Sequence, residues 1–122
     1  MTTGDTFKAV ADDNHLWMII SDTVVDSDYV VIVNFTSNRP TEEQHCIVTV
    51  GEHPFVHHDT AVRFRSAKIA RLFDLHNLLG SGKILKRQPL STLLLSRIRT
   101  GALASQFIPI GCRDMLSFQG IV

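Results

Sequence analysis

The sequence of 122 residues contains only two cysteines and no long apolar run. Cys46 and Cys112 have no CxxC spacing and no second pair, so we expect two reduced, buried thiols. No stretch approaches the roughly 18 apolar residues that a membrane span needs. The opening residues, MTTGDTFKAVADDN, lack the basic-then-apolar order of a signal peptide. We therefore expect a cytoplasmic protein with no membrane partner.

The sequence also lacks a net charge, internal repeats and low-complexity segments. Its hydrophobic content of 44% and charged content of 20% are those of an ordinary globular protein, and its length suits a single domain over residues 1–122. The charges are unevenly divided: residues 1–60 hold two basic and ten acidic residues, and residues 61–122 hold ten basic and two acidic. Either the basic half forms a face for nucleic acid or an acidic partner, or the two halves interleave and neutralise each other.

Short apolar stretches separated by turn residues dominate the first seventy positions. The strongest is DYVVIVNFT over residues 28–36, where β-branched and aromatic residues predominate until Asn34 and Thr36 bring polar groups to its C-terminal end. The last stretch, residues 67–73, suits a helical turn as well as a strand. The predicted strands are residues 6–10, 15–21, 28–36, 44–50, 60–64 and 67–73.

The pattern changes after GSGK at residues 80–83. In residues 89–105 apolar side chains recur every four positions, which predicts an α-helix that starts near Pro89 or Ser91. The apolar stripe comprises Leu94, Ile98 and Ala102. The sequence thus predicts a mainly β fold: a small β-barrel over roughly residues 4–75, followed by a C-terminal α-helix.

Five segments carry a resemblance to a known family. They are GDTF, HLWMIIS, VVIVNFTS, HHDTAVRF and GKILKRQPLSTLLLSRIRTGAL. In this order they resemble the MazF/PemK/Kid toxin family, small SH3-like barrels that cleave RNA without a metal. Thr36 and Ser37 match the end of a family strand, with Asn34 in place of a proline, and Asp59 matches the acid of an Arg-x-Asp segment, with His57 in place of the arginine. The first loop, ADDN, is short and acidic where the family's is long and often basic.

The segment EHPFVHHDT, residues 52–60, holds three of the six histidines and also raises the question of a metal site. His53 and His57 are four residues apart, which suits a shared ion only on a helix, and Pro54 argues against a helix there. Adjacent side chains in a strand point to opposite faces, so His57 and His58 do not easily share an ion. The sequence therefore predicts no metal site, and a metal-dependent hydrolase is the least favoured function.

Cleavage of RNA through its 2′-hydroxyl needs a base, an acid and groups that stabilise the charged phosphorane. Histidine can act as base or acid near neutral pH, a carboxylate can orient it, and a hydroxyl can hold a phosphate oxygen. The predicted catalytic residues are His57, His58, Asp59, Thr36 and His15. The residues predicted to bind RNA are Arg63, Arg65, Ser37, Lys86 and Arg87. In the alternative, Pro54 and Asp59 build a turn, His53 and His58 bond to the backbone, and the arginines face solvent.

Two functions of different classes follow. The resemblance implies a metal-independent endoribonuclease, an mRNA interferase of a toxin–antitoxin system, that acts on single-stranded RNA as a homodimer without a cofactor and is neutralised by a cognate antitoxin protein. The alternative is a non-catalytic SH3-like barrel that binds a peptide or protein partner in the same groove. Thr36, the HHD segment and the basic second half favour the nuclease, whereas the acidic first loop and the missing family arginines favour the binding module.

Overall fold

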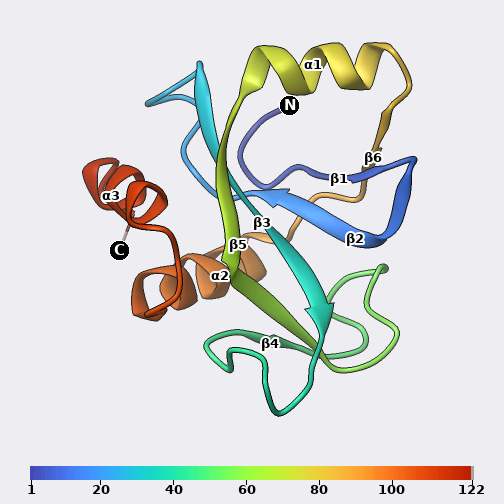
Figure 1. Ribbon diagram of the computed structural model, residues 1–122, viewed down its shortest axis with the longest axis vertical. Coiled ribbons are helices and arrows are strands. Elements are labelled where there is room, and N and C mark those ends of the chain that lie inside the picture. The colour runs from blue at the N-terminus through green and yellow to red at the C-terminus, as the bar shows by residue number, and fades with distance from the viewer. Residues whose placement is uncertain (122) are drawn as a thin grey trace.

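The computed structural model describes residues 1–121, apart from the side chains of residues 13 and 14, as one six-stranded sheet with three helices. The strands are β1 (Thr6–Ala9), β2 (Asp12–Ile19), β3 (Tyr29–Ser37), β4 (Ile47–Val48), β5 (Thr60–Arg71) and β6 (Ile84–Arg87). The helices are α1 (Leu72–Gly80), α2 (Thr92–Ala104) and α3 (Ile110–Phe118). All paired strands are antiparallel, in the order β4-β5-β3-β2-β1-β6. The sheet curls into a half-barrel with β4 and β6 at its edges (Figure 1).

The β3–β5 pair is the longest ribbon of the sheet. Its apolar run is buried on both faces, which explains why β3 shows no apolar-polar alternation until its end. The pairing register shifts along the ribbon, because Ile32 pairs with Lys68 whereas Asn34 pairs with Arg63. The extra residues of β5 at this point form a bulge, and bulges bend a sheet. The bend contributes to the curl that Figure 1 shows.

Two apolar cores lie on opposite faces of the sheet. The larger core contains side chains of α2 and α3 together with one face of β3, including Val31, Val33 and Phe35. The smaller core contains Leu72 and Leu75 of α1 against the other face of β3. Figure 1 shows the same division, with α1 at one end of the molecule and α2 and α3 at the other side of the ribbon. The sheet therefore packs apolar side chains on both of its faces.

The two ends of α2 have different roles: the first turn fixes where the helix starts, and the last turn packs closely against the sheet. Ser91 is the N-cap, and its hydroxyl accepts a hydrogen bond from the Leu94 backbone N–H at 3.1 Å. Near the other end, a Cβ at Gly101 would lie 3.0 Å from Phe64 Cζ and 3.1 Å from the His45 carbonyl oxygen. A side chain has no room there, so this glycine allows the close approach of helix and sheet.

The predicted mainly β fold with a C-terminal helix is confirmed, as are strands near residues 6–10, 15–21 and 28–36. Other boundaries were wrong. Strand β2 starts at Asp12, so most of the predicted first loop, ADDN, belongs to this strand. Strand β4 has only two residues, and the two strands predicted over 60–64 and 67–73 form the single strand β5, which ends where α1 begins. The sequence analysis also missed α1 and α3, as well as β6, which extends the sheet beyond residue 75. Each of these three elements places only one or two side chains in the buried cores, which gives a weak periodic signal.

The two oppositely charged halves of the chain interleave in this sheet. Among the side chains that the structure describes, ion pairs join acids of the first half to bases of the second: Asp5 with Lys86, Glu42 with Arg63, and Glu52 with Arg97. The uneven charge distribution is therefore at least partly neutralised within the fold. Among residues 1–121, no helix combines the length and the apolar character that crossing a membrane would require. Cys46 and Cys112 are buried and unbridged, as predicted.

Candidate functional site

The candidate site lies at the end of the ribbon where β3 finishes at Ser37 and β5 starts at Thr60. Residues 49–59 connect β4 to β5 and fold beside this end. The backbone N–H of Asn38 donates to the Asp59 carbonyl at 3.1 Å, which holds the connection next to the end of β3. Polar residues at the end of β3 and in the connection therefore meet in space.

The first half of the connection is fixed by Glu52. Its carboxylate forms an ion pair with Arg97 of α2 and accepts a hydrogen bond from the Thr49 backbone N–H at 2.7 Å. The pKa of the Glu52 carboxyl is lowered, mainly by the hydrogen bond from Thr49 and further by Arg97, although partial desolvation opposes the effect. The side chain is thus held as a carboxylate that ties the connection to α2.

His53 is a structural residue of the same half. It is 5% exposed, and both of its ring nitrogens have backbone partners. The Phe55 N–H donates to Nδ1 at 3.1 Å, so Nδ1 carries no proton and Nε2–H donates to the Gln88 carbonyl at 2.7 Å. The ring also makes an edge contact with Phe35, with centroids 6.2 Å apart. The alternative in which His53 bonds to the backbone is therefore correct.

The second half of the connection presents its histidines to solvent. Val56 is buried in the larger core, whereas His57 and His58 are exposed. Both precede β5, so the alternation expected of a strand does not separate them, and both line one hollow of ≈ 340 Å³. The other side chains of this hollow are Lys8, Phe35, Thr36, Ser37, Phe55 and Thr60. Four of the residues predicted from the sequence therefore share one cavity.

One hydrogen bond crosses this hollow. His58 Nε2 lies 2.9 Å from Ser37 Oγ, which joins the connection to the end of β3. The Thr60 hydroxyl donates to the His58 carbonyl at 2.9 Å and fixes the backbone beneath the ring. His58 therefore bonds to a side chain rather than to the backbone, and its imidazole is positioned beside two hydroxyl-bearing residues.

A second hollow of ≈ 230 Å³ adjoins the first and shares Phe55 and His57 with it. Its wall includes Arg87 of β6, one of the residues predicted to bind RNA. Lys8 of β1 lines the first hollow and Arg87 the second, so basic side chains come from two neighbouring strands. A bound anion at His57 would meet positive charge on both sides.

The other predicted residues lie outside these two hollows. Arg63 forms an ion pair with Glu42 at 3.9 Å. Lys86 does so with Asp5 at 3.3 Å. The guanidinium of Arg65 lies 5.5 Å from the centre of the Phe107 ring, in contact with the α2–α3 segment rather than with the histidines.

His15 and Asp59 are also set apart from the hollows. His15 Nδ1 lies 3.2 Å from the Phe35 carbonyl oxygen, so its ring is tied to the backbone of β3. Asp59 is exposed, and its carbonyl accepts the Asn38 bond described above. Neither residue contributes to the walls of the two cavities as the structure describes them.

Sequence reasoning missed Lys8 and Phe55. Lys8 is one of only two basic residues before position 61, but a lone lysine in a short strand carries no motif. Phe55 stacks on Phe35 with ring centroids 6.4 Å apart and forms the wall between the hollows. Its position between Pro54 and Val56 could have indicated a packed connection, since such a loop buries part of its own apolar side chains.

Among the described side chains of residues 1–121, no three His, Cys, Asp or Glu residues come close enough to hold a metal ion. Comparison of the chain with protein-family models, with curated proteins and with solved structures gives no match in any of the three.

Proposed function

We propose that this protein is an endoribonuclease that cleaves single-stranded RNA with its own side chains. The observation that carries the proposal is the hollow at the end of the β3–β5 ribbon, where two histidines, three hydroxyl-bearing residues and a lysine converge from separate segments. Metal-free cleavage of RNA requires these types of group: two that can exchange protons and several that can bind a phosphate. The adjoining hollow with Arg87 would hold a neighbouring phosphate of the same strand.

In the proposed reaction, one imidazole of the pair His57 and His58 takes the proton of the ribose 2′-hydroxyl. The 2′-oxygen attacks the adjacent phosphorus, and the bond from phosphorus to the 5′-oxygen breaks. The other imidazole, in its protonated form, gives its proton to that leaving oxygen. The products are a 2′,3′-cyclic phosphate and a 5′-hydroxyl. Thr36, Ser37 and Lys8 would stabilise the charge that builds up on the phosphate oxygens.

The resemblance to the MazF/PemK/Kid family supports the same proposal from an independent direction. The positions that match the family's motifs, Thr36 and Ser37 in one segment and Asp59 in another, are far apart in sequence, and the Asp59 carbonyl accepts a hydrogen bond from the N–H of Asn38, the residue after Ser37. An SH3-like, MazF/PemK-like barrel is the fold that the proposal implies. A cytoplasmic homodimer, neutralised by a cognate antitoxin protein, is the corresponding biological assembly.

The proposal is tested by RNA cleavage with purified protein in excess chelator. We expect products that end in 2′,3′-cyclic phosphate and a rate that falls by about 100-fold or more in His57→Ala or His58→Ala, because each ring would serve in proton transfer. The control is His45→Ala, which removes an exposed histidine outside both hollows. Asp59→Ala is expected to have a smaller effect, because its side chain does not line the site.

The alternative, a binding module without catalysis, is favoured by one observation. Arg63 and Lys86, two cations that RNA binding would use, are paired with acidic side chains of the same chain. Folded wild-type protein that leaves RNA intact in chelator, and also with added divalent metal, would support this alternative. A nuclease should in addition arrest growth when its expression is induced, whereas His58→Ala should not.

A further inference from the structure

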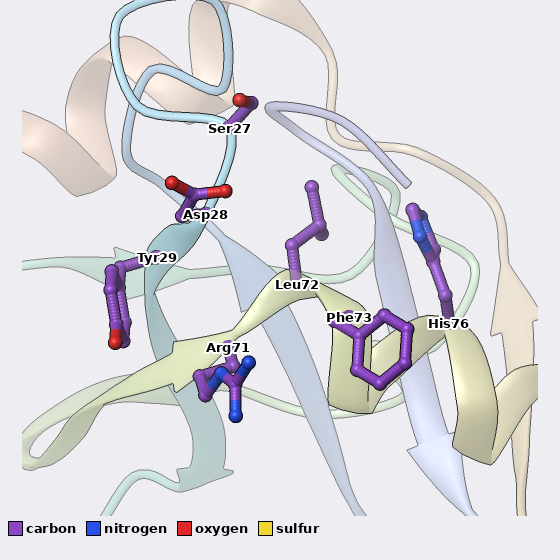
Figure 2. Close-up of a pocket in the computed structure, with 7 residues that line it drawn as sticks. All are labelled: Ser27, Asp28, Tyr29, Arg71, Leu72, Phe73 and His76. Atoms are coloured by element: carbon purple, nitrogen blue, oxygen red, sulfur yellow. The ribbon is translucent and has the colours of Figure 1, made fainter.

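A separate pocket, of ≈ 410 Å³, lies at the opposite end of the β3–β5 ribbon from the candidate site. Tyr29 is the first residue of β3 and pairs with Arg71, the last residue of β5. The chain then turns into α1, whose first residues form the other wall (Figure 2). No part of the proposed ribonuclease chemistry uses these residues.

The walls of this pocket are held by backbone hydrogen bonds. The Leu72 N–H donates to the Asp28 carbonyl at 2.9 Å and ties the start of α1 to the β2–β3 loop. The Asp26 carboxylate accepts bonds from the N–H groups of Asp28 and Tyr29 at 2.9 and 3.0 Å. The loop on one side and the helix on the other are therefore fixed before any ligand arrives.

Two aromatic rings in the pocket are unusually exposed. Tyr29 is 47% exposed and Phe73 is 64% exposed. Figure 2 shows the Arg71 side chain between these rings in that view. The guanidinium lies 6.0 Å from the centre of the Phe73 ring, and within residues 1–121 it makes no hydrogen bond or ion pair. The pocket thus presents aromatic faces and an uncommitted cation.

Asp28 and His76 also line the pocket. The Asp28 carboxylate projects on the side of the β2–β3 loop, away from Phe73 in Figure 2. His76 projects from α1, and its Nε2 lies 2.9 Å from the amino nitrogen of Met1. The pocket therefore combines a hydrogen-bond acceptor, aromatic surfaces and a cation within one hollow.

We infer that this pocket binds a nucleotide. The base of a nucleotide has two aromatic faces for stacking, and its ring or amino N–H groups can donate hydrogen bonds to a carboxylate. The phosphate of the nucleotide is bound best by a cation. Tyr29 or Phe73 would stack on the base, Asp28 would accept from its edge, and Arg71 would bind the phosphate. This inference does not depend on the proposed function, because it rests on different residues at the other end of the ribbon.

The experiment uses the fact that Tyr29 is the only tyrosine of the chain. Labelling with 3-fluorotyrosine places a single fluorine in the pocket, so one ¹⁹F resonance reports on it. Titration with AMP is expected to shift this resonance. Adenosine and inorganic phosphate, which each carry one part of AMP, are titrated separately. We expect each half to bind at least about tenfold more weakly than AMP, since each lacks one of the two contacts.

Matched variants assign the contacts. Arg71→Gln should weaken AMP by about tenfold and leave adenosine unchanged, whereas Phe73→Ala should weaken both. The controls are Arg39→Gln, a loop arginine near the other end of β3, and Phe118→Ala, an 89% exposed ring outside the pocket, and neither should change the titration.

Three results would overturn the inference: no shift with millimolar AMP in folded protein, inorganic phosphate bound as tightly as AMP, or AMP binding unchanged in both Arg71→Gln and Phe73→Ala. RNA cleavage by the same preparation is measured separately. If the protein cleaves RNA but AMP does not shift the resonance, only the nucleotide inference is overturned. If it binds AMP but does not cleave RNA, only the proposed nuclease function is overturned.

Discussion

The two halves of segment 52–59 use the same residue type in opposite ways. In the first half, His53 is buried with both ring nitrogens bonded to the backbone, next to Glu52 in an ion pair with α2. In the second half, His57 and His58 are exposed and line a hollow. Histidines that cluster in a sequence therefore need not form one site. The first half of this segment anchors the connection to the rest of the fold, and the second half exposes its histidines to solvent.

The largest effect on stability is expected from the anchoring half. His53→Ala removes a buried side chain, leaves the partly buried Phe55 N–H without its acceptor and loses the contact with Phe35, which should lower the free energy of unfolding by about 2 kcal/mol. His57→Ala and His58→Ala remove exposed side chains and should change it by less than about 0.5 kcal/mol. Urea unfolding of the three variants measures the difference.

The Nδ1 bond can be isolated with His53→Asn. Asparagine accepts a hydrogen bond from the backbone N–H two residues later, so it should recover part of the loss in His53→Ala. Equal destabilisation by alanine substitution at His53, His57 and His58 would contradict the division of the segment into two roles.

A smaller effect is expected from the ion pair of the anchoring half. Because the pKa of Glu52 is lowered in the folded protein, its contribution to stability is present above its ordinary value of 4.5 and is lost as the pH falls through the folded value. Glu52→Gln should reduce the free energy of unfolding by up to about 1 kcal/mol at pH 7, and the gap to wild type should narrow below pH 4.5.

The measurement is urea unfolding at several pH values from neutrality down to about pH 3. The matched control is Glu42→Gln, which breaks the 3.9 Å pair with Arg63 elsewhere in the fold. A gap between wild type and Glu52→Gln that stays constant down to the lowest pH would show that the carboxylate charge does not hold the anchor.

The smallest effect concerns the thiols. Burial raises the pKa of both Cys46 and Cys112, and near Cys46 the charge of Arg97 lowers it while that of Glu52 raises it. Removal of the Glu52 charge in Glu52→Gln should therefore speed the reaction of Cys46 with a disulfide reagent at pH 8 by less than about tenfold. Cys112, whose pKa depends on burial, serves as the internal control. Equal acceleration of both thiols would indicate general unfolding instead.

The sequence predicted elements wherever one segment buried many side chains. The run of β-branched residues in β3 and the apolar stripe of α2 each contribute several residues to a core, so the continuous apolar run of the strand and the four-residue spacing of the helix are both visible in the sequence. Strand β6 buries only Ile84 and exposes its three other residues, and its basic sequence favoured a loop. The candidate site was predictable in part, because Thr36, Ser37 and the histidines ended or followed apolar segments. The contribution of Lys8 depends on strand pairing, which residue patterns do not specify.

Strand β1 lies between two partners that are synthesised at very different times. Lys8 is near its neighbour β2 in sequence, but the β6 residue opposite it is Leu85, in the last third of the chain. A nascent chain that has emerged from the ribosome only through β5 already contains His57, His58 and the hydroxyls of β3. It lacks β6, and with it Arg87 and the Gln88 carbonyl that holds His53. Pairing across so long a span is slow to form, so the site is completed only after most of the protein has been translated.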